Sequence, residues 1–510
     1  MKKRALISVS DKRGIVEFAS GLQKLGFEII STGGTLAALQ QAGVEATGVE
    51  TVTGFPEILD GRVKTLHPLI HGGILNKRND ELQQQQLREN NIEQIDIVAV
   101  NLYPFKETVS KENASHEEII ENIDIGGPSM LRAAAKNYQD VLVIVNPEDY
   151  ENVLDRLASG QATEAFRQRL AAKVFQHTAQ YDALIAQYFS DKTDQAYPQD
   201  FTVTYEKVQD LRYGENPHQT AAFYQTPLAV PMSLAAAEQW HGKELSYNNI
   251  QDANACLEML AEFSEPAAVA VKHMNPCGIG AGTDIEEAFG KAYAADPISI
   301  FGGIVAVNRE VTTKLAGKLS SIFLEIVIAP AYSSEAKEIL TKKKNIRLLT
   351  LAMNGASTAL MKLTSVKGGL LVQSSDSKVL HAADFSYPTK RKPTDTEMQD
   401  LLFAEKACKH VKSNAIVVAK NQQTLGVGAG QMNRVGAALI ALEQAGKKSQ
   451  TAVMASDAFF PMPDTVEAAA KAGIAAIIQP GGSKRDQDSV AVCDEHGIAM
   501  VYTNTRHFKH

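Results

Sequence analysis

The sequence predicts an α/β protein made of two parts. In the first part, short apolar runs alternate with helical patterns, which is typical of a parallel sheet covered by helices. In the second part, an apolar strand, a lysine and a glycine-rich run recur as an internal repeat. A polar stretch over residues 191–200, which contains Pro198, separates the two parts and marks the expected domain boundary.

Four apolar runs are expected to form the parallel sheet of the first part, at residues 5–9, 27–30, 95–100 and 141–145. Helical patterns lie between most of these runs, which favours parallel rather than antiparallel strands. A long amphipathic helix is expected from Glu164 to Phe189, because Phe166, Leu170 and Val174 recur at near-helical spacing.

The repeat of the second part is visible in two segments. Residues 268–282 read AVAVKHMNPCGIGAG, and residues 415–430 read AIVVAKNQQTLGVGAG. In both, a lysine ends an apolar strand, G-x-G-A-G follows at the same interval, and a helical pattern comes next. We interpret this as a duplicated strand–helix unit, which predicts two similar lobes, roughly 200–375 and 376–510. Chance similarity of two strand–glycine turns is the alternative.

Composition excludes several classes of protein. The 510 residues are 44% hydrophobic and 22% charged, as in ordinary globular proteins, and the net charge of -8 argues against a nucleic-acid-binding domain. Four scattered cysteines without a C-x-x-C motif indicate a reduced, cytoplasmic protein. No apolar run is long enough for a membrane span, and no signal peptide is expected.

Two turns that follow strands of the first part predict an anion site. STGGT at residues 31–35 and SDK at residues 10–12 each come directly after an apolar run. Backbone amides at the start of a helix attract anions, and two such turns on neighbouring strands favour a phosphate site over plain helix capping. The predicted residues are Ser10, Asp11, Lys12, Ser31, Thr32, Gly33, Gly34 and Thr35.

The segment GRVKTLHP, at residues 61–68, is a second candidate for anion binding. Arg62 and Lys64 alternate as on an extended segment, so both would point the same way, although a solvated basic face fits equally well. His67 and His71 have the spacing of a metal-binding pair. We expect no metal there, because Pro68 and Gly72 make a regular helix improbable.

Other candidates follow strands or begin helical patterns. Tyr103 lies just after the run 95–100, and DIGGP at residues 124–128 begins a helical pattern that carries Lys136. In the second part, Lys272 and His273 could supply a cation and a base. For each of these the structural alternative is a packed turn residue or a solvated helix face.

The motifs together are more specific than any one of them. STGGT, GRVKTLHP, NLYPF, DIGGP, RAAAKN, LRYGENPHQ, VKHMNPCG, FGGIVA, GAGQMNR and DAFFP occur in one order. They closely resemble the family of bifunctional purine biosynthesis enzymes that join phosphoribosylaminoimidazolecarboxamide formyltransferase to IMP cyclohydrolase, over about residues 4–510. The resemblance implies a methylglyoxal-synthase-like cyclohydrolase domain, 1–195, and a formyltransferase domain, 200–510, of two cytidine-deaminase-like lobes.

The resemblance also implies ligands and partners. The formyl donor would be 10-formyltetrahydrofolate as a cosubstrate, with no tightly bound cofactor. The acceptor would be aminoimidazole carboxamide ribotide, whose product the cyclohydrolase closes to IMP. Small molecules rather than nucleic acid or membrane are the expected partners, and the enzyme would be a homodimer.

Roles in catalysis and binding follow from the same resemblance. In formyl transfer, His273 would be the base, Lys272 the cation that stabilises the oxyanion, and Asn414 a neighbour of the reacting centre. In ring closure, Lys136 would be the proton donor, with Lys64, Tyr103 and Asp124 around the reacting groups. Nucleotide binding is implied for Arg62, Thr65, Asn101, Gly126, Gly127, Arg212, Tyr213, Phe301, Gly302, Glu325, Arg434, Arg506 and Phe508, and folate binding for Phe459 and Thr465.

Three features depart from the resemblance or leave alternatives open. Glu325 occupies a position where the family often has aspartate, and Thr465 one where some members have asparagine. The zinc motif of nucleoside deaminases is missing, since Cys277 has no second cysteine at the needed spacing, so zinc is not expected. A zinc nucleoside deaminase and a non-catalytic nucleotide sensor are the alternatives.

Overall fold

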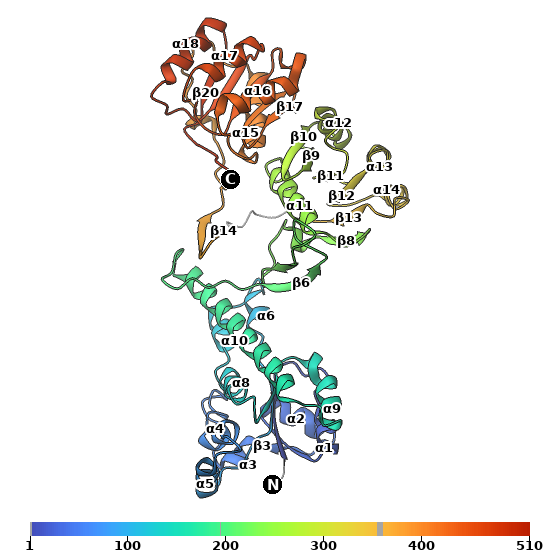
Figure 1. The fold of residues 1–510 in the computed structure, drawn as a ribbon, viewed down its shortest axis with the longest axis vertical. Coiled ribbons are helices and arrows are strands. Elements are labelled where there is room, and N and C mark those ends of the chain that lie inside the picture. The colour runs from blue at the N-terminus through green and yellow to red at the C-terminus, as the bar shows by residue number, and fades with distance from the viewer. Residues whose placement is uncertain (1–2, 194, 354–360) are drawn as a thin grey trace. The chain divides into compact units, whose positions relative to one another are not determined.

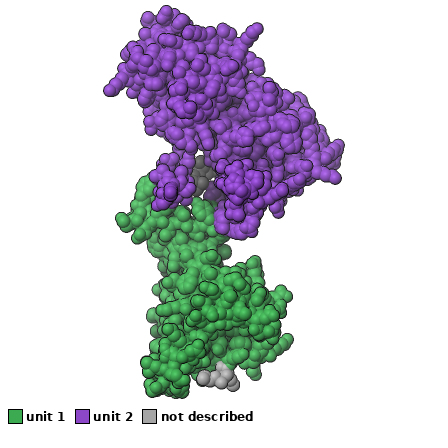
Figure 2. All heavy atoms as spheres, viewed as in Figure 1, with its two compact units in different colours: residues 1–206, 226–228 green, residues 207–225, 229–510 purple. Residues whose placement is uncertain are grey.

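The computed structural model describes residues 3–193, 195–353 and 361–510, and the chain forms two compact units (Figures 1 and 2). Unit 1 comprises residues 1–206 and 226–228, and unit 2 comprises residues 207–225 and 229–510. Among the described residues, none of the helices is both long and apolar enough to cross a bilayer.

Unit 1 is built on one parallel sheet. Its strand order is β3-β2-β1-β4-β5, and every neighbouring pair is parallel. The four predicted strands are confirmed, whereas the two-residue strand β3 was not predicted. The strands are β1 (Lys3–Val9), β2 (Phe27–Ser31), β3 (Thr47–Gly48), β4 (Ile97–Asn101) and β5 (Leu142–Ile144).

Apolar side chains on both faces of this sheet are buried under helices. Ala5 and Ile7 lie in one core with Phe18 of α1 (Ile15–Lys24), while Leu6 lies in the other with Met130 of α8 (Gly126–Lys136). Burial on both faces explains why the strands are continuous apolar runs rather than alternating ones. The predicted long helix is confirmed as α10 (Glu164–Lys192).

The other helices of unit 1 connect the strands or cover them. They are α1 (Ile15–Lys24), α2 (Gly33–Gln41), α3 (Val49–Thr53), α4 (Pro68–Leu75), α5 (Glu81–Glu89), α6 (Phe105–Val109), α7 (His116–Glu121), α8 (Gly126–Lys136) and α9 (Tyr150–Ala158), with a 3₁₀ helix at Pro147–Asp149.

The expectation that Pro68 and Gly72 prevent a regular helix is wrong. Helix α4 begins at Pro68, where proline costs little because the first amides of a helix have no intrahelical partner. His67 caps this helix, since its Nδ1 accepts a hydrogen bond from the Leu69 amide at 3.2 Å. Among the described residues, no group of three or more histidines, cysteines or carboxylates is placed to bind a metal.

Unit 2 contains one large mixed sheet, in which the two sequence repeats have the same strand arrangement. The order is β20-β19-β18-β16-β17-β10-β9-β11-β12-β13-β8. The two lobes meet where β17 pairs with β10. Outward from there, β16, β18, β19 and β20 of one lobe correspond to β9, β11, β12 and β13 of the other. The strands are β8 (Glu238–His241), β9 (Ala267–Lys272), β10 (Asn275–Ala281), β11 (Gly303–Val307), β12 (Leu324–Ala329), β13 (Arg347–Thr350), β16 (Ile416–Lys420), β17 (Gln423–Gly428), β18 (Val453–Ser456), β19 (Ala476–Gln479) and β20 (Ala499–Tyr502).

Helices cover both faces of this sheet. α11 and α15 share one continuous core that spans both lobes, while α12–α14 and α16–α18 cover the other face of their own lobes. They are α11 (Tyr247–Leu260), α12 (Ile285–Ala295), α13 (Thr313–Ser320), α14 (Ser334–Leu340), α15 (Asp395–Lys409), α16 (Arg434–Ala445), α17 (Asp464–Lys471) and α18 (Asp486–His496).

Two separate ribbons and several short helices complete the described part of the chain. The ribbons pair β6 (Glu206–Leu211) with β7 (Ala221–Gln225), and β14 (Met361–Val366) with β15 (Gly369–Ser374). Short 3₁₀ helices lie at Leu234–Ala236, Ala382–Asp384 and Gly446–Ser449.

The glycine-rich runs of the repeat are strands, whereas a strand–helix unit would make them the connection between strand and helix. They lie in β10 and β17, the second strands of two hairpins. A side chain at Gly278 or Gly280 would collide with the backbone of α12, and one at Gly426 or Gly428 with that of α16. The glycines therefore allow helix and sheet to approach closely.

The true turns of these hairpins come directly after the lysines. His273 and Met274 have φ values of 53° and 61°, and Asn421 and Gln422 have 54° and 53°. Two successive left-handed residues are the geometry of a tight two-residue hairpin turn. The hairpin turn of the first lobe thus places His273 at the tip, beyond the end of the buried strand β9.

Candidate active sites

The two predicted anion-binding turns of unit 1 meet at the carboxyl edge of the sheet. Asn101, at the end of β4, accepts hydrogen bonds from the amides of Ser10 and Asp11 at 2.6 and 2.9 Å. Its side-chain Nδ2 donates to the Asp11 carbonyl at 3.0 Å. Asn101 therefore fixes the turn that follows β1 and carries Lys12.

Two lysines converge on the first turn of α2. A β-carbon on Gly33 would lie 3.8 Å from Nζ of Lys64, and one on Gly34 would lie 3.9 Å from Nζ of Lys12. The first amides of a helix have no intrahelical acceptor, and the helix dipole makes this end electropositive. Free amides and two ammonium groups in one place are the features with which a helix N-terminus can hold a phosphate.

The hydroxyl groups of the STGGT turn are already engaged in the protein. Ser31 donates to the Ile7 carbonyl at 2.8 Å, and Thr35 donates to the Val9 carbonyl at 2.9 Å. The Thr32 hydroxyl lies 2.7 Å from that of Ser8. These three side chains hold the turn against β1, so a ligand would be bound by the backbone of Gly33 and Gly34 instead.

A half-buried carboxyl group lies beside this site. Oδ1 of Asp124 accepts a hydrogen bond from the Gly127 amide at 2.8 Å. Burial raises the pKa of Asp124, although the amides of Gly127 and Tyr103 and the charge of Lys64 act in the opposite direction. A protonated Asp124 could donate to a departing oxygen.

The neighbours of Asp124 are predicted site residues. Thr65 is buried, and a β-carbon on Gly126 would lie 2.7 Å from its Oγ1. The Tyr103 side chain is 40% exposed, so it can reach a ligand. The structure thus brings together Lys12, Gly33, Gly34, Lys64, Thr65, Asn101, Tyr103, Asp124, Gly126 and Gly127.

Two predicted residues of unit 1 lie apart from this cluster. Lys136 is the last residue of α8, ten residues after Gly126, which separates them by roughly 15 Å along the helix axis. Since α8 leads from the carboxyl edge of the sheet back to the start of β5, Lys136 lies at the opposite edge. Arg62 lies in a turn rather than an extended segment and forms an ion pair with Glu121.

In unit 2, Lys272 and His273 lie at the end of the buried strand β9. Nζ of Lys272 donates to the Phe301 carbonyl at 2.6 Å and would lie 3.8 Å from a β-carbon on Gly302. Phe301 is 59% exposed, and the His273 side chain is also exposed. The structure therefore brings Lys272, His273, Phe301 and Gly302 to one accessible place.

Two residues that the sequence analysis did not single out hold this turn. The Met274 amide donates to Oδ1 of Asp252 at 2.7 Å, and Asn275 donates to the His273 carbonyl at 3.1 Å. Asn275 also accepts a hydrogen bond from the Lys412 amide at 3.3 Å, which joins the two lobes. The repeat carried a signal, because Asp400 precedes Lys420 by the same twenty residues that separate Asp252 from Lys272, and it binds the second turn in the same way.

The second lobe adds Asn414 close to this junction. Nδ2 of Asn414 donates to the Gln431 carbonyl at 2.7 Å. The preceding residue, Ser413, donates to Oδ2 of Asp457 at 2.5 Å. Asp457 in turn forms an ion pair with Arg434, which is only 6% exposed. The predicted nucleotide-binding Arg434 is therefore engaged inside the protein, where it supports the segment that carries Asn414.

The remaining predicted residues of unit 2 lie in different surroundings. The Arg506 guanidinium stacks on Phe508 at 4.3 Å from the ring centroid, and that of Arg212 lies 5.8 Å from the ring of Tyr213. Glu325 forms an ion pair with Arg347 at 2.7 Å.

The two predicted folate-binding residues differ in accessibility. Phe459 is 39% exposed, whereas Thr465 is completely buried and its amide bonds to Asp464 at 2.7 Å. Phe459 can contact a ligand in this conformation and Thr465 cannot.

Comparisons with known proteins match both parts of the chain. A family model described as "AICARFT/IMPCHase bienzyme" matches residues 134–444, and one described as "MGS-like domain" matches residues 14–129. The "Bifunctional purine biosynthesis protein PurH" of Oceanobacillus iheyensis is 66% identical over 510 residues, and that of Bacillus cereus is 61% identical over 511 residues; both matches span the whole of both chains. A solved structure, "Crystal structure of ForH", is 37% identical and covers 37% of this chain and all of its own, with a TM-score of 0.33.

Proposed function

Because the chain belongs to the AICARFT/IMPCHase bienzyme family, we propose that its two parts divide the two reactions of that family between them. The chain is a bifunctional enzyme of purine biosynthesis, with phosphoribosylaminoimidazolecarboxamide formyltransferase and IMP cyclohydrolase activities, and its N-terminal part is an MGS-like domain. This membership favours neither a zinc nucleoside deaminase nor a non-catalytic sensor.

We assign ring closure to residues 1–195 and formyl transfer to residues 200–510. For the second domain we propose two cytidine-deaminase-like lobes, 200–375 and 376–510. The matching strand order and the equivalent left-handed turns of the two lobes support this proposal. By family resemblance we further propose that the enzyme is a cytoplasmic homodimer that uses 10-formyltetrahydrofolate as cosubstrate.

For formyl transfer, the observation that carries the proposal is the turn that places Lys272 and His273 side by side at an accessible edge. The acceptor amine is a weak nucleophile, so a base must take its proton as the bond to the formyl carbon forms. We assign this role to His273 and stabilisation of the tetrahedral oxyanion to Lys272. The bond to the folate nitrogen then breaks, and that nitrogen takes the proton.

For ring closure, the candidate phosphate site on α2 and the half-buried Asp124, whose pKa is raised, carry the proposal. The carboxamide nitrogen attacks the formyl carbon of the same molecule, so a correctly held substrate needs little further activation. One proton from the carboxamide and one from the formamide nitrogen leave with the oxygen as water. We assign proton donation to Asp124 together with Lys64, because Lys136 lies too far from this cluster.

The whole activity is tested with the full chain. Supplied with aminoimidazole carboxamide ribotide and 10-formyltetrahydrofolate, the protein should produce IMP. Supplied with the formylated ribotide alone, it should produce IMP without folate. Failure of both reactions in folded protein would contradict the proposal.

Replacement of Lys12 by alanine is expected to weaken binding of the formylated ribotide. A charge-assisted contact to phosphate contributes about 1.5–3 kcal/mol, so KM for ring closure should rise about tenfold or more while kcat changes little. Initial rates against ribotide concentration measure this, and the exposed Lys77 provides a control variant, Lys77→Ala. An unchanged KM would remove Lys12 from the phosphate site.

A further inference from the structure

The C-terminal segment of the chain has side chains that alternate between buried and exposed. His507 is 4% exposed and Lys509 is half-buried, whereas Arg506 and Phe508 point to solvent. An extended chain directs successive side chains to opposite sides, so whatever holds His507 also sets the direction of its two neighbours.

Backbone hydrogen bonds dock this segment against the second lobe. The His507 amide donates to the Asp457 carbonyl at 3.0 Å, and the Ser413 amide donates to the Lys509 carbonyl at 2.8 Å. The Lys509 amide donates to the Ser413 hydroxyl at 3.1 Å. The segment therefore lies directly beside Asn414.

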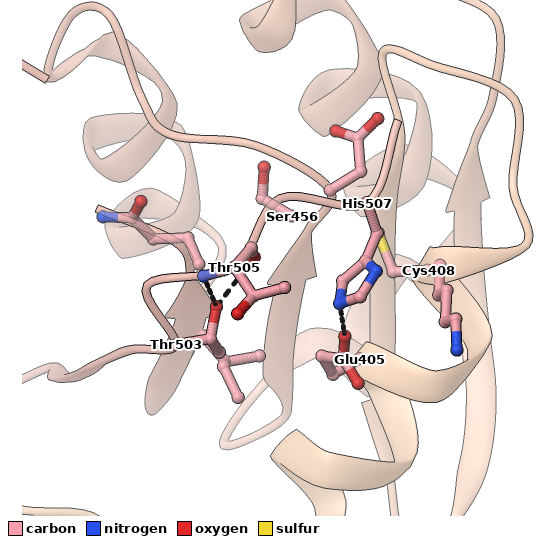
Figure 3. Close-up of a pocket in the computed structure, with 10 residues that line it drawn as sticks. Glu405, Cys408, Ser456, Thr503, Thr505 and His507 are labelled. Carbon is pink, nitrogen blue, oxygen red and sulfur yellow. Dashed lines mark hydrogen bonds and ion pairs between the residues drawn. The ribbon is translucent and has the colours of Figure 1, made fainter. Parts of the chain in front are cut away.

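The ring of His507 lies between two carboxylates. Its Nδ1 is 2.6 Å from Oδ2 of Asp376. Its Nε2 is 3.2 Å from Oε1 of Glu405 on α15 (Figure 3). Nε2 is a buried nitrogen that makes no well-directed hydrogen bond, so Glu405 packs beside it without bonding to it. Asp376 is therefore the hydrogen-bonding partner of the ring, and Glu405 closes its other side.

A second contact ties the segment to the first lobe. Nζ of Lys509 lies 2.9 Å from Oε2 of Glu258 on α11. This ion pair is more exposed than the one around His507, so solvent screens it more and it should contribute less. His507 is thus the main side-chain anchor of the segment.

We propose that His507 is a positioning residue for formyl transfer: held between Asp376 and Glu405, it anchors the C-terminal segment and so presents Arg506 and Phe508 to the phosphorylated acceptor. The proposal rests on the binding roles proposed for Arg506 and Phe508. His507 itself touches no substrate, and its effect is on the direction of its neighbours.

The charges around the anchor make it sensitive to pH. His507 and Glu405 face Asp376, Lys409 and Glu262. Burial raises the pKa of Glu405 to about 7; the charges of His507 and Lys409 oppose this, and the other two carboxylates add to it. Neutral Glu405 favours the anchored state, and this contribution is lost as the pH rises through about 7.

The test uses the full chain and two measurements. His507→Gln should raise KM for aminoimidazole carboxamide ribotide about tenfold or more, as expected for a lost charge-assisted contact, with a smaller effect on kcat. Ring closure of the formylated ribotide should be unchanged. In hydrogen exchange, the backbone amides of residues 504–510 should exchange faster than in the parent. His496→Gln, at an exposed position on α18, is the matched control.

Two further variants separate the possible failures. Asp376→Asn weakens the anchor from its half-exposed side without disturbing the core, and it should shift KM in the same direction. Because the pKa of Glu405 is about 7, KM of the parent should rise above that pH, and Glu405→Gln should abolish this rise.

The comparison with Arg506→Ala distinguishes the anchor from the binding roles on which it rests. If Arg506→Ala leaves KM unchanged, the proposed binding role of Arg506 is wrong. If Arg506→Ala raises KM while His507→Gln changes neither KM nor exchange of the segment, the anchoring role is wrong.

Discussion

Replacement of His273 by asparagine should lower the rate of formyl transfer by about 10²–10⁴-fold, the usual contribution of a positioned base. Asparagine is the informative choice because Asn421 occupies the equivalent left-handed position in the second lobe. It should therefore keep the hairpin turn, including the bond from the Met274 amide to Asp252. The variant removes the base and little else.

Ring closure of preformed formylated ribotide should proceed at the parent rate in the same variant, because His273 belongs to unit 2 and the proposed cyclohydrolase cluster to unit 1. Both rates are measured on one protein preparation, with His496→Asn as a control for a histidine change elsewhere. Loss of both activities in a folded variant would show that the two reactions are not divided between the domains as proposed. Unimpaired transfer would remove His273 from the role of base.

The strands of unit 1 could be predicted because burial on both faces leaves an uninterrupted apolar run. Val98 and Ala99 face opposite sides of the sheet, and both are completely buried. The repeat of unit 2 was visible for the same reason. Its hairpins were missed, because Gly278 and Gly280 suggest a turn, whereas they permit close contact with α12.

The chemistry of the sites was predicted less completely than the fold. Asn101 meets the turn after β1 as expected, because parallel strands bring their carboxyl ends to one edge. Lys272 meets Phe301 for a different reason: β9 is antiparallel to β11, so its end lies beside the start of that strand. Hydrogen bonds between distant segments leave no local pattern, so the bridge from Asn275 to Lys412 could not be predicted. Asp252 left a signal only through its repeat partner, Asp400.

Lys136 lies far from Asp124 in the structure although their motifs are neighbours in the sequence. RAAAKN and DIGGP lie close in the sequence, which suggests one site. Helix α8 connects them, and its length carries Lys136 to the opposite edge of the sheet from Asp124. A helix of this length holds its two ends far apart in space, although the residues at those ends are close in the sequence.

Replacement of Asp124 by asparagine should slow ring closure by about 10²–10⁴-fold and leave formyl transfer intact. Asparagine keeps the size of the side chain and can still accept the bond from the Gly127 amide, but it cannot donate an acidic proton. Because burial raises the pKa of Asp124, its protonated form persists to higher pH than that of an exposed aspartate. The parent kcat for ring closure should fall as the pH rises through this pKa, and the variant should lack this dependence.

Lys64→Met and Lys136→Ala decide which lysine assists Asp124. Lys64 lies close to Gly33 of the proposed phosphate site, so its loss should raise KM for the formylated ribotide. Its charge also lowers the pKa of Asp124, so its loss should shift the pH profile of ring closure to higher pH. Lys136 lies roughly 15 Å from Gly126 along α8, too far for a direct proton transfer, so its loss should leave the pH profile unchanged. If the pH profile of ring closure shifts in Lys136→Ala and not in Lys64→Met, the acid role belongs to Lys136. The C-terminal end of α8 would then have to reach the substrate from the opposite edge of the sheet.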